Sequence, residues 1–279
     1  MPPSSLFSAS APGASQQDLP LSSDLCMSIN ETSFKYKMII AYDGTNYGGW
    51  QIQPNAVSIQ SLIEQALCTI LRQQIPIFGS GRTDAGVHAL SQVAHFCSEL
   101  SIDIGKTFAS LNGLLPPDIR ILSLEQVPND FHARFSAVAK TYHYRLHLNA
   151  IPDPFKRRYA YHVPHAVDID LLKSAAAHFI GTHDFTSFAN EPGRGSAAHD
   201  AVRTLSRLDV IEEPGGIRLE LQGDGFLYKM VRNIVGTLLD VCAEKIAQDQ
   251  IPAILAAKDR RLAGRSAPPH GLYLVEVIY

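Results

Sequence analysis

The chain has 279 residues, of which 46% are hydrophobic and 18% charged, a composition typical of folded globular domains and unlike that of a disordered protein. Its 24 basic and 27 acidic residues nearly balance, and three of the acidic ones, Asp18, Asp24 and Glu31, precede the first basic residue, Lys35. The rest of the chain is neutral, which excludes binding of nucleic acid through bulk charge and requires that any RNA contact use locally gathered arginines and lysines.

The first 34 residues are rich in serine, proline and alanine and contain no lysine or arginine. They lack the basic start of a secretory signal and the arginines of an organelle transit peptide. We predict a disordered tail or an over-extended start over 1–34, with Met27 and Met38 as later starts. Nowhere does an apolar run approach the ~20 residues of a membrane span. The cysteines form no CxxC motif, which favours reduced thiols in a cytoplasmic protein.

The first part of the body alternates strands and helices. The expected elements in chain order are strand 36–42, helix 59–71, strand 76–79, strand 90–97, helix 106–114 and strand 119–127. Ser58 can cap the first helix, and Pro116 and Pro117 stop the second. This β-α-β-β-α-β order is typical of a ferredoxin-like unit with an antiparallel sheet.

A long strand over 137–148 follows, and the proline-rich residues 150–165 are expected to cross between two halves. The second half should contain a helix that Asp168 or Asp170 caps and Gly181 ends. Its further expected elements are a mobile loop over 189–200, a hairpin of strands 203–211 and 217–222 around Pro214-Gly215-Gly216, a helix from Leu227 to Cys242, and strand 272–278.

The predicted fold class is therefore α+β. We expect two ferredoxin-like (RRM-like) α/β halves that share a mainly antiparallel sheet, with a cleft between them. The expected divisions are the tail 1–34, an N-terminal catalytic half 35–150 and a C-terminal half 151–279. The two halves show no sequence repeat.

The segment from Gly79 to Gly86 is the sharpest candidate for chemistry, because three glycines flank Arg82 and Asp84 after a strand. A nearby guanidinium favours an ionised carboxylate, which can act as a nucleophile. The alternative is an aspartate that merely caps its own turn, with an incidental arginine, and the residues alone favour that alternative.

Residues 79–89 resemble the catalytic motif of the tRNA pseudouridine synthase A family, and the resemblance covers nearly all of 36–279. Seven further motifs follow the family's order: Asp43-Gly44-Thr45 through Gly49-Trp50-Gln51, Phe131-His132-Ala133-Arg134-Phe135-Ser136, Lys140-Thr141-Tyr142, His183-Asp184-Phe185-Thr186-Ser187-Phe188, Arg203-Thr204, Phe226 through Met230-Val231-Arg232-Asn233, and Gly271-Leu272-Tyr273-Leu274.

The resemblance implies isomerisation of uridine to pseudouridine at positions 38, 39 and 40 of the tRNA anticodon stem-loop, without a cofactor. It implies that Asp84 is the nucleophile, and attack on C6 of the base or on C1′ of the ribose both remain open. The uridine must first leave the helical stack, at a cost of roughly a few kcal/mol.

The resemblance also assigns roles to other residues. Tyr142 would stack on the uracil or act as general base, although a core tyrosine is the alternative. Arg232 would be the ion partner of Asp84, and Arg82 would fill the vacated space, hold phosphate or hold Asp84. From the spacing we expect Lys229, Arg232 and Asn233 to lie opposite the apolar stripe of their helix, in its first turns.

Further cations are candidates for phosphate contacts, although each is also an ordinary surface residue: Lys229, Arg134, Arg194, Arg203 and Arg207. The pairs His143–His147 and His162–His165 lack the cysteine or carboxylate that would complete a metal site, so we expect no metal.

The family resemblance implies a homodimer that binds tRNA in the cytoplasm, with no membrane partner. Two other function classes are alternatives. One is a catalytically silent RNA-binding protein on the same scaffold, which retention of Asp84, Tyr142 and Arg232 disfavours. The other is a zinc-dependent base deaminase, whose His/Cys ligand signature is lacking from the sequence.

Overall fold

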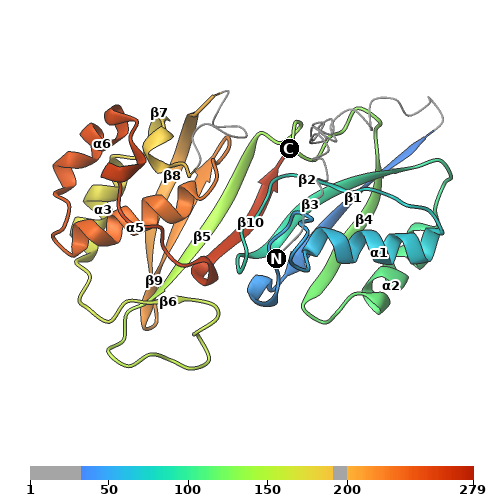
Figure 1. Ribbon diagram of the computed structural model, residues 1–279, viewed down its shortest axis with the longest axis horizontal. Helices are drawn as coiled ribbons and strands as arrows, with labels where there is room; N and C mark the ends of the chain where they lie inside the picture. The colour runs from blue at the N-terminus through green and yellow to red at the C-terminus, as the bar shows by residue number, and fades with distance from the viewer. Residues whose placement is uncertain (1–32, 191–199) are drawn as a thin grey trace, which may run out of the picture.

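The structure is a computed structural model that describes residues 33–190 and 200–279. Within these residues the chain forms one ten-stranded, mostly antiparallel sheet and five α-helices, which confirms the predicted α+β class (Figure 1). The strands follow the order β4-β1-β3-β10-β5-β9-β8-β7, with β2 beside β3 and β6 beside β5. No helix of the described ranges combines the length and apolar character needed to cross a membrane.

One end of the sheet carries the N-terminal elements. Its strands are β1 (Phe34–Tyr42), β2 (Phe78–Gly79), β3 (His88–Ser98) and β4 (Ile119–Val127), and its helices are α1 (Ile59–Leu71) and α2 (Ile104–Leu114). Every second side chain of β1, from Tyr36 to Tyr42, is buried. These side chains share a hydrophobic core with Ile59, Ile63 and Leu67 of α1, so the strand and the helix bury their apolar faces together.

The other end of the sheet carries the later elements. Its strands are β5 (Ala139–His147), β6 (Tyr161–His162), β7 (Gly181–Asp184), β8 (Val202–Glu213) and β9 (Gly216–Gly223), and its helices are α3 (Ile169–Ala177), α5 (Met230–Cys242) and α6 (Ile251–Ala257). Figure 1 shows these three helices grouped at the β7–β8–β9 end, away from α1 and α2.

The last strand, β10 (Leu272–Ile278), joins the two ends of the sheet. It runs parallel to β3 on one side and antiparallel to β5 on the other. Leu274 of β10 is paired with Ala89 of β3 and with Tyr142 of β5. The start of β3 and the middle of β5 therefore lie at the same level, two strands apart.

Several predicted boundaries are confirmed. Ser58 caps α1, because its Oγ accepts a hydrogen bond of 3.1 Å from the backbone N–H of Ser61. The predicted hairpin is also present: Glu213 pairs with Gly216, which leaves Pro214 and Gly215 as a two-residue turn.

Other predicted boundaries were wrong. The second helix begins at Ile104 rather than Lys106, because Asp103 caps it through a 3.0 Å bond from the Lys106 N–H. Gly181 does not end α3, which stops at Ala177; instead Gly181, with φ of +111°, opens β7. Neither β7 nor α6 was expected from the sequence.

Two expectations fall largely outside the described residues. The predicted tail over 1–34 does so except at its end, where Phe34 already belongs to β1. The predicted mobile loop over 189–200 does so except at 189, 190 and 200, and Arg194 lies in the part that is not described.

Candidate active site

Asp84 lies in the loop between β2 and β3, and the start of this loop is fixed to β3. The N–H of Ser80 donates to the carbonyl of Val93 at 2.7 Å, and the Ser80 hydroxyl donates to Oε1 of Gln92 at 2.7 Å. Nε2 of Gln92 in turn donates to the carbonyl of Gly81 at 2.9 Å. The backbone ahead of Asp84 is thus held by a regular strand, which gives the carboxylate a defined place.

A second glycine-rich segment packs against the same loop. Gly49 has φ of +95°, and a Cβ there would lie 2.5 Å from the carbonyl oxygen of Thr83. The N–H of Trp50 donates to that oxygen at 3.1 Å, and the indole of Trp50 covers Gly79, where a Cβ would lie 2.6 Å from the ring. Tyr42 and Thr83 share a hydroxyl hydrogen bond of 2.8 Å. These close approaches explain why the sequence needs glycine at both positions.

Arg232 of α5 forms an ion pair with Asp84 across 148 residues of sequence. Its Nη1 donates to Oδ2 of Asp84 at 2.6 Å, and its Nε donates to the carbonyl of Ala267 at 2.7 Å. The side chains of Arg232 and Asp84 are only 12% and 17% exposed. Two bonds in a fixed fork hold the guanidinium, and through it the carboxylate, in one orientation.

Asn233, the next residue of α5, is fully buried. Its amide donates to the carbonyl of Phe188 at 2.6 Å and to Oδ1 of Asn190 at 2.9 Å. Its side-chain oxygen Oδ1 accepts from Nη2 of Arg260 at 2.9 Å and from the hydroxyl of Ser266. This network fixes the start of the helix to the segment that precedes β10.

The predicted position of Asn233 was therefore wrong, because it does not share the polar face of α5 with Lys229. The reason lies in where the helix begins. Lys229 is not in the first turn: it precedes Met230 in a left-handed conformation with φ of 60°. Its ammonium lies 5.0 Å from the centre of the Tyr228 ring. The helical spacing assumed for residues 229 to 233 does not apply.

Tyr142 of β5 lies close enough to Asp84 for the two to interact electrostatically. It is 8% exposed, and its ring meets that of Phe226 edge-on with the centres 4.9 Å apart. Burial, and after it the charges of Tyr42 and Asp84, raise the pKa of the Tyr142 hydroxyl above its ordinary value. Among the described residues, that hydroxyl forms no hydrogen bond.

Arg82 lies two residues before Asp84 but is exposed to solvent. Within the described part of the chain, the ion pair of Asp84 is with Arg232 and none joins it to Arg82. The guanidinium that holds the carboxylate thus comes from a distant helix. The loop's own arginine faces solvent.

Arg207 and Arg203 differ in how closely carboxylates compensate their charge. Arg207 contacts two carboxylates, Asp209 at 3.7 Å and Glu220 at 3.2 Å, so its charge is already compensated. Arg203 is 16% exposed and its nearest carboxylate, Asp200, is 3.9 Å away. Arg203 is the better placed of the two to meet an anion.

His88 at the start of β3 was not singled out in the sequence, yet it ties three segments together. Its ring stacks on Tyr273 of β10 with the centres 4.8 Å apart, and its Nε2 lies 3.0 Å from the carbonyl of Arg158. Asp43, 3.1 Å from Nδ1 of His88, also accepts a hydrogen bond of 2.7 Å from the Tyr159 hydroxyl. The segment around Arg158 is thereby fixed to the base of the Asp84 loop. No local pattern signals such a contact.

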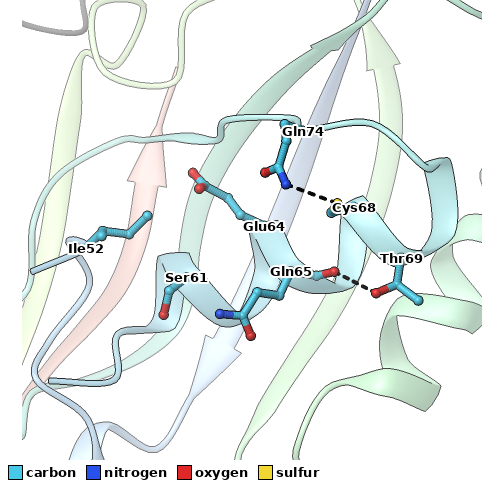
Figure 2. Close-up of a pocket in the computed structure, with 7 residues that line it drawn as sticks. All are labelled: Ile52, Ser61, Glu64, Gln65, Cys68, Thr69 and Gln74. Carbon is cyan, nitrogen blue, oxygen red and sulfur yellow. Dashed lines mark hydrogen bonds between the residues drawn. The ribbon is translucent and has the colours of Figure 1, made fainter. Parts of the chain in front are cut away.

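In the residues that the structure describes, no three histidine, cysteine or acidic side chains are grouped as a metal site would require. A shallow pocket lies on α1, apart from the Asp84 loop (Figure 2). It is lined by Ile52, Ser61, Glu64, Gln65, Cys68, Thr69 and Gln74. Its carboxylate, Glu64, already accepts from Gln60 and from the N–H of Ile77, both at 2.9 Å. The lining contains no lysine or arginine, so the pocket offers no positive charge for an RNA phosphate.

The sequence that forms this site matches a known protein family. The family model described as tRNA pseudouridine synthase matches residues 38–136 and 175–279. These ranges include Asp84 and Arg232 but leave out β5, which carries Tyr142, together with β6, most of α3 and the start of β1.

Curated relatives match over nearly their whole length. The tRNA pseudouridine synthase A 1 of Protochlamydia amoebophila is 59% identical, over 88% of this chain and 96% of its own. The tRNA pseudouridine synthase A of Bacillus velezensis is 47% identical, over 88% of this chain and 99% of its own. That of Chlamydia muridarum is 46% identical, over 86% and 90%.

Proposed function

The chain belongs to the tRNA pseudouridine synthase family, and we propose that it converts uridine to pseudouridine in tRNA through the carboxylate of Asp84. The observation that carries the proposal is the 2.6 Å ion pair between Asp84 and Arg232, within electrostatic reach of Tyr142. The uridines are those at positions 38, 39 and 40 of the anticodon stem-loop, as the resemblance to the synthase A family implies.

The reaction rearranges bonds within one nucleotide. The C1′–N1 bond breaks, the uracil turns, and a C1′–C5 bond forms; the hydrogen on C5 passes to solvent and N1 gains one. Because no group or electron enters from outside, the chemistry needs no cofactor. A carboxylate such as Asp84 can attack C6 or C1′, or stabilise an oxocarbenium-like sugar as glycosidases do. Arg232 is the positioning partner that holds Asp84 in one orientation for this step.

We propose that Tyr142 contacts the uracil, with its ring stacked on the base and its hydroxyl within reach of a polar atom of the base. Because its pKa is raised, the hydroxyl is protonated at neutral pH and is better suited to donate a hydrogen bond than to act as general base. Tyr142→Phe should then slow tritium release from uridine C5 by about 10- to 100-fold and leave tRNA affinity unchanged. A loss of about 10⁴-fold would instead assign removal of the C5 proton to this hydroxyl.

The flipped uridine must be replaced in the stack, and its neighbouring phosphates must be held. We propose Arg82 for the first task, because it is exposed two residues from Asp84. Lys229 at the start of α5 and Arg203 on β8 are proposed for the second. Arg203 is supported by its weak compensation, with Asp200 3.9 Å away.

The strand order is compatible with two ferredoxin-like halves, 35–150 and 151–279, and we propose this division with a cleft between the halves for the RNA. β4, β1 and β3 with α1 and α2 would form the first half, and β9, β8 and β7 with the later helices the second. A cytoplasmic homodimer follows from the family resemblance alone. Sedimentation equilibrium would measure the dimer directly.

The function is tested with tRNA that carries tritium at uridine C5. The protein should release the label without added metal, and release should fall to background when positions 38, 39 and 40 of the tRNA are cytidines. Binding of tRNA without release would indicate a silent RNA-binding protein and would contradict the proposal. Release from the cytidine-substituted tRNA would place the modified uridine elsewhere.

A further inference from the structure

Lys140 of β5 contacts the catalytic loop but has no part in the mechanism above. It lies two residues before Tyr142, so both side chains are on the same face of the strand. Its Nζ donates to the carbonyl of Ser80 at 2.6 Å. A Cβ on Gly81 would lie 3.1 Å from Nζ. The ammonium thus rests on the backbone that leads to Asp84.

The positive charges of Arg134 and Arg203 act on Lys140, and no carboxylate forms an ion pair with it within the described ranges. Burial, and next the charges of Arg134 and Arg203, lower the pKa of Lys140 to about 8. A Cβ on Gly225 would lie 3.1 Å from Nε of Arg203, in the turn that leads to Phe226. Because Phe226 packs on Tyr142, this group of cations borders the proposed uracil site.

Like charges that are gathered and partly desolvated are unfavourable unless an anion joins them. The ammonium has three N–H donors, and the Ser80 carbonyl takes one. Two donors therefore remain for a ligand. An oxyanion with several acceptor oxygens, such as a phosphodiester, matches two free ammonium donors within the electrostatic reach of two guanidinium groups.

We propose that Lys140, Arg134 and Arg203 bind one backbone phosphate of the tRNA beside the target uridine, and that Lys140 links this phosphate to the loop that carries Asp84. The inference rests on the proposed function, because it takes tRNA as the ligand. Binding of the correct phosphate would fix the loop through the Ser80 carbonyl at the moment when the uridine enters.

The pH dependence of tritium release tests the charge on Lys140. In the free protein the ammonium is present below its pKa of about 8 and is lost above it, so kcat/KM should fall as the pH rises through about 8. A bound phosphate stabilises the ammonium, so the corresponding fall in kcat should lie at higher pH. The charged groups that act on Lys140 are the guanidinium groups of Arg134 and Arg203.

Substitutions separate Lys140 from groups on the substrate that also titrate. Lys140→Arg keeps the charge and should remove the fall in kcat/KM near pH 8 that the lysine causes. Lys140→Met should lower kcat/KM at neutral pH by about 10-fold or more. The matched control is Lys106→Met, because Lys106 of α2 is 86% exposed and pairs with Asp103. It should behave as the wild type.

Salt dependence tests the phosphate itself. In proteins inactivated by Asp84→Asn, Lys140→Met should lower the slope of log affinity for tRNA against log salt by roughly 0.7 to 0.9, the contribution of one phosphate contact. An unchanged slope, or a fall at the same pH in kcat and kcat/KM, would restrict Lys140 to supporting the loop and would overturn the inference.

Two outcomes distinguish this inference from the proposed function. If the wild type releases tritium and the Lys140 variants show none of these effects, the phosphate site is wrong and the function stands. If the wild type releases no tritium, the proposed function itself is wrong. Should Lys140→Met lose its cooperative thermal transition, comparison of the wild type with Lys140→Arg still decides.

Discussion

Asp84→Asn should release tritium from tRNA labelled at uridine C5 at least about 10³-fold more slowly than the wild type. The amide has nearly the size and shape of the carboxylate but is neutral and is not a nucleophile. The loop should keep its conformation, because Ser80, Gly81 and Thr83 are held through bonds that do not involve the Asp84 side chain. The affinity for tRNA should therefore change by no more than a few-fold.

The matched control for Asp84→Asn is Asp170→Asn. Asp170 is exposed in the first turn of α3, where its charge interacts favourably with the helix dipole. The same chemical change there should leave both the rate of tritium release and tRNA affinity as in the wild type. If Asp84→Asn released the label at the wild-type rate, Asp84 would have no part in the reaction.

The Asp84 site shows what a single sequence contains and what it lacks. Local chemistry identified the loop from its glycines, and it offered Arg82 as the nearby cation. The cation that pairs with Asp84 is Arg232, which lies 148 residues away. Nothing in the spacing of either residue signals that contact; only the order of the family motifs pointed to it.

For the sheet too, the sequence predicted some features and not others. Alternation of apolar residues predicted β1 and β9 to within one or two residues, because burial of one face imposes a period of two. The place of β10 between β3 and β5 was not predicted. Strand order depends on pairing between distant segments, which the period of one strand does not encode.

Asn233 shows why a helical pattern can mislead. Spacing from Lys229 placed it on a polar face, but α5 begins one residue after Lys229. The buried amide is stable there because Phe188, Asn190, Arg260 and Ser266 satisfy its hydrogen bonds. Those partners lie in two distant segments, 188–190 and 260–266, so composition and period indicate a surface residue where the fold has a buried one.

Arg232→Gln should slow tritium release by about 10²- to 10³-fold, because it removes the charge that faces Asp84 and the fork that orients it. The unpaired, mostly buried carboxylate should also lower the free energy of unfolding by about 1–3 kcal/mol. Arg232→Lys restores a charge but not both bonds, to Asp84 and to the Ala267 carbonyl. Its rate should fall between those of the wild type and Arg232→Gln.

A double-mutant cycle then tests whether Arg232 acts through Asp84. If it does, Arg232→Gln should cost less stability in the Asp84→Asn protein than in the wild type, because the amide needs no cation. The control is Arg261→Gln: Arg261 pairs with Asp259 at the same 2.6 Å, but its side chain is 88% exposed, so its loss should change stability little. Equal losses from Arg232→Gln in both backgrounds would mean that Arg232 supports the Ala267 segment instead of the carboxylate.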